Sequence, residues 1–333
     1  MKRILVSLAI HEKPDVIIDQ IENFKYFLNN VCFILHVSKS YFEKYEIEKL
    51  QNIEDVYLNP ENLVTKWGNI VSTHISNYNY AKDNINFDYI LFHSSNDMYV
   101  KKGAYEYIIN HDAGFQLRKV NRNNIHWWPG FLAINDIQLE KMKNKVGKTT
   151  LLASQLEGSF YKKEIMDKVI DVINLYYDEN TSKEFYPKEE FYFSTLSSTI
   201  TDWSKIGKPV IFSEIHRFDK VLWRLKNRFR KINKYIFSKI FGWKIYYKFE
   251  NFFNSALFRS RFYQISKKDI KRIIENKKKY FFKQNNLNDG SGYFQLYDLN
   301  NLYGVKRIER DYNNKIRKYI RKIMKGSKNE KIV

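Results

Sequence analysis

The sequence has few cysteine, proline and glycine residues and no long apolar run. Cys32 is the single cysteine among 333 residues, which excludes an intramolecular disulfide and a cysteine-rich zinc site. Its apolar setting predicts that it fills a core position. With 12 glycines, 5 prolines and 44% hydrophobic residues, the chain does not have the composition of a disordered protein. No run approaches the roughly 20 apolar residues that a membrane-spanning helix needs.

Several common catalytic motifs are also missing. Neither G-x-G-x-x-G nor G-x-x-x-x-G-K-[ST] occurs, which argues against dinucleotide binding and P-loop chemistry. The seven histidines show no H-E-x-x-H or Cys/His spacing, so a transition-metal site is disfavoured, whereas carboxylate-bound Mg²⁺ stays open. Asp97 lacks a second aspartate two residues away, so the D-x-D signal of metal-dependent sugar transferases is absent. Asp97 is therefore either a ligand contact after a strand or part of a polar turn that caps the next helix.

Acidic residues are outnumbered by basic ones. The chain has 57 Lys and Arg against 37 Asp and Glu, a net charge of +20, which predicts attraction to an anion. Residues 220–248 contain about ten Lys or Arg and no acid, interleaved with aromatic residues, and a predicted helix over 306–325 repeats the pattern. Three interpretations stay open: an anionic membrane surface, nucleic acid, or packed helices with a solvated basic face.

Strand and helix patterns alternate through the first half of the chain. The predicted strands are 4–10, 31–37, 56–58 and 89–93, and the predicted helices are 14–27, 39–50, 70–81 and 163–176. This alternation is typical of a parallel α/β sheet, on which ligands gather at the carboxyl ends of the strands. His11, Ser38 and Asp97 follow three of those ends.

Two adjacent acids follow Pro187 and open a further predicted helix. The exposed N–H groups of a helix N-terminus favour negative charge, so Glu189 and Glu190 suit a first turn. A carboxylate held there at the edge of a core is also a candidate general base. The pair is thus either a favourable first turn or one half of an active site.

The order of segments resembles the core-2/I-branching N-acetylglucosaminyltransferase and xylosyltransferase family (glycosyltransferase family 14-like). The similar segments are 9–14, 36–40, 62–68, 89–101, 157–161, 189–196 and 268–283. Together they span roughly residues 4 to 284. The chain has Ser38 where the family often has aspartate, and Gln284-Asn285 where the family has F-D.

The resemblance implies a GT-A-like, Rossmann-type nucleotide-sugar-binding fold with a mixed central sheet flanked by helices, plus a basic helical C-terminal extension. It implies Glu190 as the base that deprotonates the acceptor hydroxyl, and Arg and Lys in place of a metal at the departing diphosphate. The expected nucleotide-sugar contacts are His11, Asp97, Arg259, Arg261 and Lys283, with the spacing leaving open which arginine meets the diphosphate. The expected acceptor contacts are Trp128, Glu157 and Glu189.

The predicted function is therefore an inverting glycosyltransferase that needs neither metal nor other cofactor. It moves a sugar, by default N-acetylglucosamine, from a UDP-sugar to a glycan or lipid-linked acceptor, as a β-1,6-N-acetylglucosaminyltransferase would. We expect a role in bacterial surface polysaccharide synthesis, at the cytoplasmic face of an anionic membrane and without nucleic acid. The alternative is a basic nucleic-acid-binding protein or a membrane-associated scaffold without catalysis.

The predicted domain organisation has four parts. Residues 1–215 form the catalytic core, 216–256 a basic aromatic helical insertion, 257–290 the diphosphate-binding end of the catalytic domain, and 291–333 a basic helical tail.

Overall fold

A computed structural model gives the architecture of most of the chain. It describes residues 1–65, 68–120, 128–147, 150–179, 186–212, 240–242, 245, 248, 265–275, 301–306 and 308–329. Most of the predicted insertion, together with Arg259, Arg261 and Lys283, lies outside these residues.

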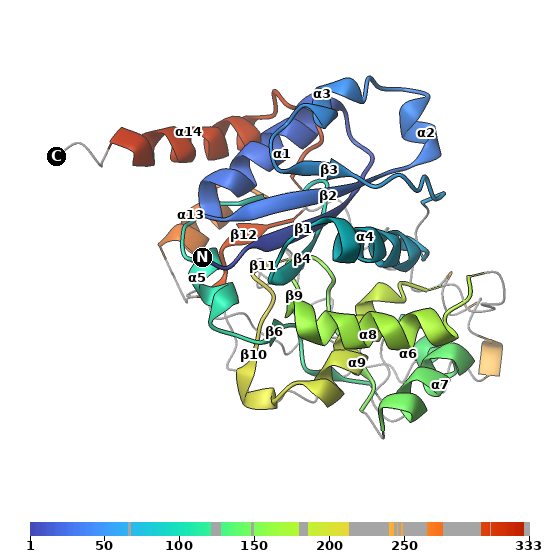
Figure 1. Ribbon diagram of the computed structural model, residues 1–333. Coiled ribbons are helices and arrows are strands. Elements are labelled where there is room, and N and C mark those ends of the chain that lie inside the picture. The colour runs from blue at the N-terminus through green and yellow to red at the C-terminus, as the bar shows by residue number, and fades with distance from the viewer. Residues whose placement is uncertain are drawn as a thin grey trace.

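A seven-stranded mixed sheet forms the centre of the molecule (Figure 1). Its strands, in spatial order, are β10 (Ile206–Gly207), β6 (Ala113–Gly114), β9 (Phe160–Lys162), β4 (Tyr89–Ser94), β1 (Ile4–Ile10), β2 (Val31–Val37) and β3 (Val56–Leu58). Only β9 runs antiparallel to its neighbours, while β1 pairs in parallel with both β2 and β4. Every residue of β1 and β2 is buried, which matches their continuous apolar runs.

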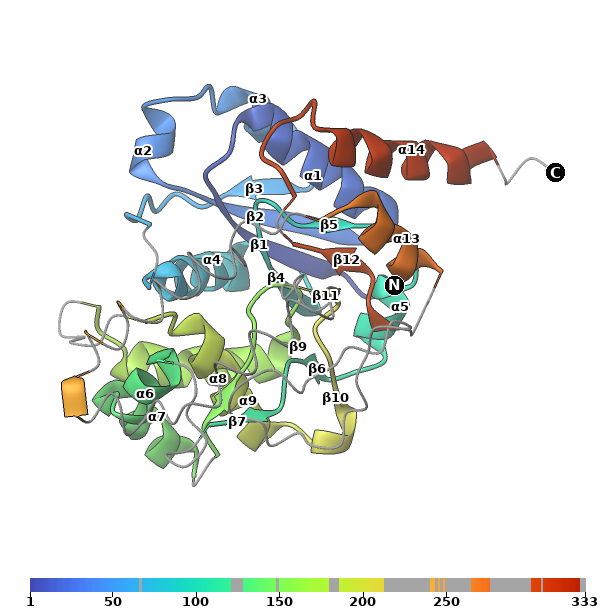
Figure 2. The same cartoon turned by 180° about the vertical axis from the view of Figure 1, so that it is seen from behind.

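Helices cover both faces of the sheet, as both views show (Figure 2). One face carries α1 (Pro14–Phe27), α3 (Glu48–Gln51) and α5 (Ala104–Ile109), and the other carries α4 (Ile70–Asn84), α7 (Ile137–Val146), α8 (Lys163–Tyr176) and α9 (Glu189–Ile200). This region is completed by the short helices α2 (Lys39–Phe42), α6 (Trp128–Ile134) and η1 (Trp203–Lys205) and by a two-stranded antiparallel sheet of β7 (Arg118–Lys119) and β8 (Leu152–Ala153). The predicted mixed α/β fold with a flanked central sheet is confirmed.

One predicted helix is wrong. The sequence pattern predicted a single helix over 39–50, but the chain forms α2 and α3 with a turn between them. Tyr41, Ile47 and Leu50 are all buried, but Tyr41 and Leu50, nine residues apart, would lie on opposite sides of a continuous helix. Breaking the helix allows all three side chains to reach the core.

The C-terminal segment returns to the body of the protein. β12 (Gly304–Val305) lies between β11 (Ile211–Phe212) and β5 (Met98–Tyr99) in a small second sheet. α13 (Lys267–Ile274) and α14 (Lys315–Asn329) complete a third apolar cluster with Ile270, Val305 and Ile320. The predicted helix over 306–325 is therefore helical only from Lys315. The proposed domain boundaries stay a prediction.

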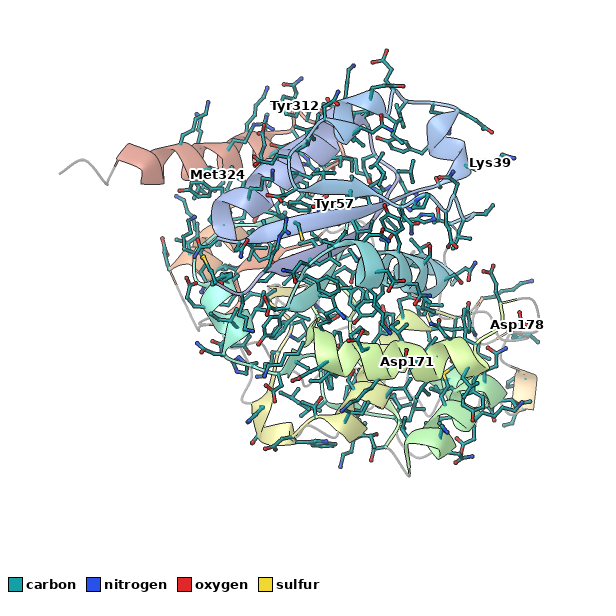
Figure 3. All side chains as sticks on the ribbon, in the orientation of Figure 1. Lys39, Tyr57, Asp171, Asp178, Tyr312 and Met324 are labelled. Carbon is teal, nitrogen blue, oxygen red and sulfur yellow. The ribbon has the colours of Figure 1, made fainter. Side chains whose placement is uncertain are left out.

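α14 packs beside α1, and its far end projects from the body (Figures 1 and 2). Arg317 is fully buried and donates from Nη1 to Asp19 Oδ2 at 2.8 Å, and Arg321 donates to Asp19 Oδ1 at 2.9 Å. The Arg321 guanidinium also lies over the Tyr312 ring, 4.1 Å from its centroid. Figure 3 labels Tyr312, which precedes α14, and Met324, which lies on it. The side of α14 that carries Arg317 and Ile320 therefore packs against the body of the protein.

Candidate active site

A pocket of about 560 Å³ lies at the carboxyl ends of β1 and β4. The polar side chains that line it come from six regions of the chain: His11 after β1, His74 on α4, residues 93–96 at the end of β4 and just after it, Glu157 before β9, Glu189 and Glu190 at the start of α9, and Lys306, Glu309 and Arg310 after β12. This is the edge at which ligands bind in open α/β sheets. The pocket therefore brings together sequence-predicted residues from both halves of the chain.

Asp136 anchors the start of α9, where the two adjacent acids lie. One oxygen, Oδ2, accepts hydrogen bonds from the hydroxyls of Tyr186 at 2.6 Å and Tyr192 at 2.8 Å. The same oxygen lies 3.5 Å from Lys188 Nζ, and Oδ1 caps α7. Because residues on both sides of Glu189 are held by one buried carboxylate, the first turn of α9 has little freedom. Asp136 is a positioning residue that sequence reasoning missed.

Burial raises the pKa values of both acids. The pKa of Glu189 rises from 4.5 to about 7, and that of Glu190 to about 8, chiefly because a carboxylate loses hydration at this place. The nearby Glu157 carboxylate raises both pKa values further, whereas Lys306 lowers them. Glu189 Oε2 is buried without a hydrogen-bond partner among the described residues. An acid with a pKa near 8 is a strong enough base to take a proton near neutral pH.

Glu157 faces these acids from the loop between β8 and β9. Its position depends on Gly158, which has φ +76° and whose missing Cβ would lie 2.6 Å from Ile211 N. Any side chain there would push the loop away from β11. Glu157 forms an ion pair with Lys306, so a cation lies in a pocket that is lined by four carboxylates, those of Glu157, Glu189, Glu190 and Glu309.

Asp97 lies beneath the pocket and is not among its lining residues. Its side chain is fully buried, with Oδ2 2.9 Å from His93 Nδ1 and 3.0 Å from the Ser94 N–H that donates to it. Ser94 Oγ also donates to Asp97 Oδ1 at 3.1 Å. Asp97 thus holds the turn after β4, and its neighbours Ser95 and Asn96 reach the pocket instead. Its predicted direct contact with the nucleotide sugar stays untested.

The other predicted residues fall into two groups. The pocket unites His11, Glu157, Glu189 and Glu190, as described above. Trp128 begins α6, but its side chain lies outside the described part of the structure, as do Arg259, Arg261 and Lys283. Sequence reasoning missed His74, Lys306 and Arg310, because no local pattern distinguishes them from other polar residues of the chain.

Two features are absent from the described part of the chain. No three His, Cys, Asp or Glu side chains there gather in an arrangement that would hold a metal ion. No helix in the same part of the chain is long and apolar enough to cross a membrane. The metal-free mechanism and the membrane contact stay predictions.

Comparisons with known proteins give weak likenesses only. No family model and no curated protein matches the sequence. Among solved structures, the galactosyltransferase LgtC, in complex with donor and acceptor sugar analogues, is 7% identical with a TM-score of 0.35, over 64% of this chain and 76% of LgtC. The apo-form glycosyltransferase GlyE of Streptococcus pneumoniae is 9% identical with a TM-score of 0.32, over 77% of this chain and 64% of GlyE. Scores this low support no conclusion about the activity of this chain.

Proposed function

We propose that the protein is an inverting glycosyltransferase with a GT-A-like fold that uses a nucleotide sugar as donor. The observation that carries the proposal is Glu190, a carboxylate of raised pKa on the wall of a pocket at the carboxyl ends of a mostly parallel sheet. The pocket also contains cationic side chains, Lys306 and Arg310. A base beside cations is the combination that sugar transfer without a metal requires.

The reaction follows from these roles. Glu190 removes the proton from an acceptor hydroxyl, the oxygen attacks the anomeric carbon of the donor, and the bond to the diphosphate breaks. The diphosphate leaves with the bonding electrons and carries at least two negative charges, which Lys and Arg side chains stabilise. Among the described residues, Lys306 and Arg310 line the pocket, where they pair with Glu157 and Glu12, so a diphosphate would compete with these carboxylates for them. The resemblance adds Arg259 or Arg261 and Lys283. The default donor is UDP-N-acetylglucosamine.

A panel of nucleotide sugars tests the proposal. We expect one of them to raise the melting temperature, because a ligand at about 100 times its Kd adds about 2.7 kcal/mol of stability. UDP-N-acetylglucosamine, UDP-xylose and UDP-galactose are compared with UDP and with a single-stranded oligonucleotide by thermal unfolding. Stabilisation by the oligonucleotide alone, at near-physiological salt, would favour a nucleic-acid-binding protein over the proposed enzyme.

We further propose that the enzyme contacts an anionic membrane through one face of α14. Lys315, Lys318, Lys322 and Lys325 are exposed and spaced by three or four residues, so they form one stripe, while Arg317 and Ile320 face the core. Because the apolar side of α14 is already buried, the contact is electrostatic, worth about 1 kcal/mol per lysine. This suits an enzyme that acts on a lipid-linked acceptor.

Vesicle sedimentation tests the membrane contact. The protein is expected to sediment with vesicles that contain anionic lipid and to remain in solution with zwitterionic vesicles. Replacing Lys318 and Lys322 with Glu should weaken binding about tenfold or more, since each lysine contributes about 1 kcal/mol. Equal binding of both proteins would exclude α14 as the contact.

A further inference from the structure

His74 is a polar pocket residue to which the proposed reaction assigns no role. It lies one turn into α4, is 1% exposed and lines the pocket. Its Nδ1 atom lies 2.8 Å from the hydroxyl of Ser7, in the middle of β1. Its ring packs edge-on against Phe92, with ring centroids 5.0 Å apart. The side chain is therefore held on two sides in one orientation.

A buried chain of hydrogen bonds determines which nitrogen of His74 carries the proton. The backbone N–H of Glu61 donates to Asn59 Oδ1 at 3.0 Å, so the Asn59 amide nitrogen must donate onward. It does so to Asn77 Oδ1 at 2.9 Å, which orients the Asn77 amide in turn. Asn77 Nδ2 then donates to Ser7 Oγ at 2.9 Å. Each step fixes the direction of the next.

Ser7 completes the chain. Its side chain is fully buried and already accepts from Asn77, so its own proton needs an acceptor. His74 Nδ1 is the acceptor that the described residues offer at hydrogen-bond distance. The proton of the neutral imidazole is therefore on Nε2, for which no partner occurs among the described residues. Burial also lowers the pKa of His74 to about 3, so the ring stays neutral.

We propose that His74 Nε2–H donates a hydrogen bond to an uncharged oxygen of the transferred sugar and so determines donor specificity. This inference rests on the proposed glycosyltransferase function. A neutral N–H group forms a weaker hydrogen bond to a phosphate oxygen than the cations Lys306 and Arg310 do. It is better suited to bind a hydroxyl or an amide carbonyl of the sugar. A bound sugar without an oxygen at that place leaves a buried N–H unpaired, at about 1–3 kcal/mol. The neighbouring Glu157, Glu189 and Glu190 carboxylates border the same pocket.

Calorimetric titration of three variants tests the inference. The ligands are UDP-N-acetylglucosamine, or whichever donor of the panel binds best, and the matching nucleoside diphosphate. In His74→Phe we expect the affinity for the nucleotide sugar to fall about 5- to 150-fold, and that for the diphosphate to stay close to wild type. His74→Gln is expected to recover part of the loss, because its amide nitrogen offers a donor near the position of Nε2. Ser72→Ala, two residues earlier on α4 and outside the pocket lining, is the control and should bind both ligands as wild type does.

The outcomes are distinct. An equal loss for both ligands in His74→Phe would give His74 a structural role and overturn the inference. If the wild-type protein binds no nucleotide sugar, the proposed function fails and the inference fails with it. Nitrogen-15 NMR of the histidine ring provides an independent readout. It should detect the proton on Nε2 in the wild type, and a spectrum with the proton on Nδ1 would contradict the hydrogen-bond chain.

Discussion

Glu190→Gln is expected to slow sugar transfer about 10²- to 10⁴-fold, the usual contribution of a general base. The amide keeps the size of the side chain but cannot accept the proton of the acceptor hydroxyl. Nucleotide-sugar binding should persist, because the amide fills the same space and Glu190, with its pKa raised to about 8, carries little charge near neutral pH. Single-turnover transfer and calorimetric binding on the same preparation measure the two effects. A variant that transfers sugar at the wild-type rate would show that Glu190 is not the base.

Glu189→Gln is the matched control on the adjacent residue. It keeps the proposed base, so transfer at saturating acceptor should persist although a predicted acceptor contact is weakened, and its pH dependence should change in a defined direction. Glu190 is an acid whose pKa is raised to about 8, so its basic form, and with it the rate, increases as pH rises toward 8. The Glu189 carboxylate contributes to that raised pKa, so its neutralisation should move the rising limb to lower pH. If the transfer rate of the wild type instead rose with an apparent pKa near 4.5, the assignment of Glu190 as the base would be contradicted.

Asp19→Ala is expected to lower the free energy of unfolding by about 3–5 kcal/mol, the largest stability effect that we predict. Asp19 is 2% exposed and accepts from both Arg317 and Arg321. Its removal leaves the Arg317 guanidinium, which is fully buried, without a counter-charge. Since Arg317 holds α14 to α1, the loss should also loosen the segment that brings Lys306 into the pocket. Denaturation in urea, followed by circular dichroism, measures the change.

Two controls separate the unpaired charge from general damage to α1. Glu22→Ala, at an exposed position of the same helix, should change stability by no more than about 0.5 kcal/mol. The double replacement Asp19→Met with Arg317→Leu should recover part of the loss, because an apolar pair needs no compensating charge, while Arg321 still loses its carboxylate partner. A double variant as unstable as Asp19→Ala would mean that packing, and not the unpaired guanidinium, causes the effect.

The sequence predicted those elements whose signals are local. The bounds of β1, α1, β2 and α8 agree with the predicted ranges, because each is a continuous apolar run or a clear helical period with an obvious start, such as Pro14 in the first turn of α1. The predicted helix over 39–50 failed where burial of Tyr41 and Ile47 outweighed local helix preference.

The sequence by itself determined the mixed α/β architecture, the strand ends at which a ligand would bind, and the opening of α9 at Glu189 and Glu190. Only the tertiary structure decided which side chains meet there. In the folded protein, Asp97 is buried against His93 and does not line the pocket. Lys306 forms an ion pair with Glu157, 149 positions away in the chain. A hydrogen-bond chain from Asn59 through Asn77 and Ser7 orients the His74 ring. The physical reason is that hydrophobic periodicity is a property of neighbouring residues, whereas ion pairs, pKa values and hydrogen-bond direction depend on distances that exist only once the chain is packed.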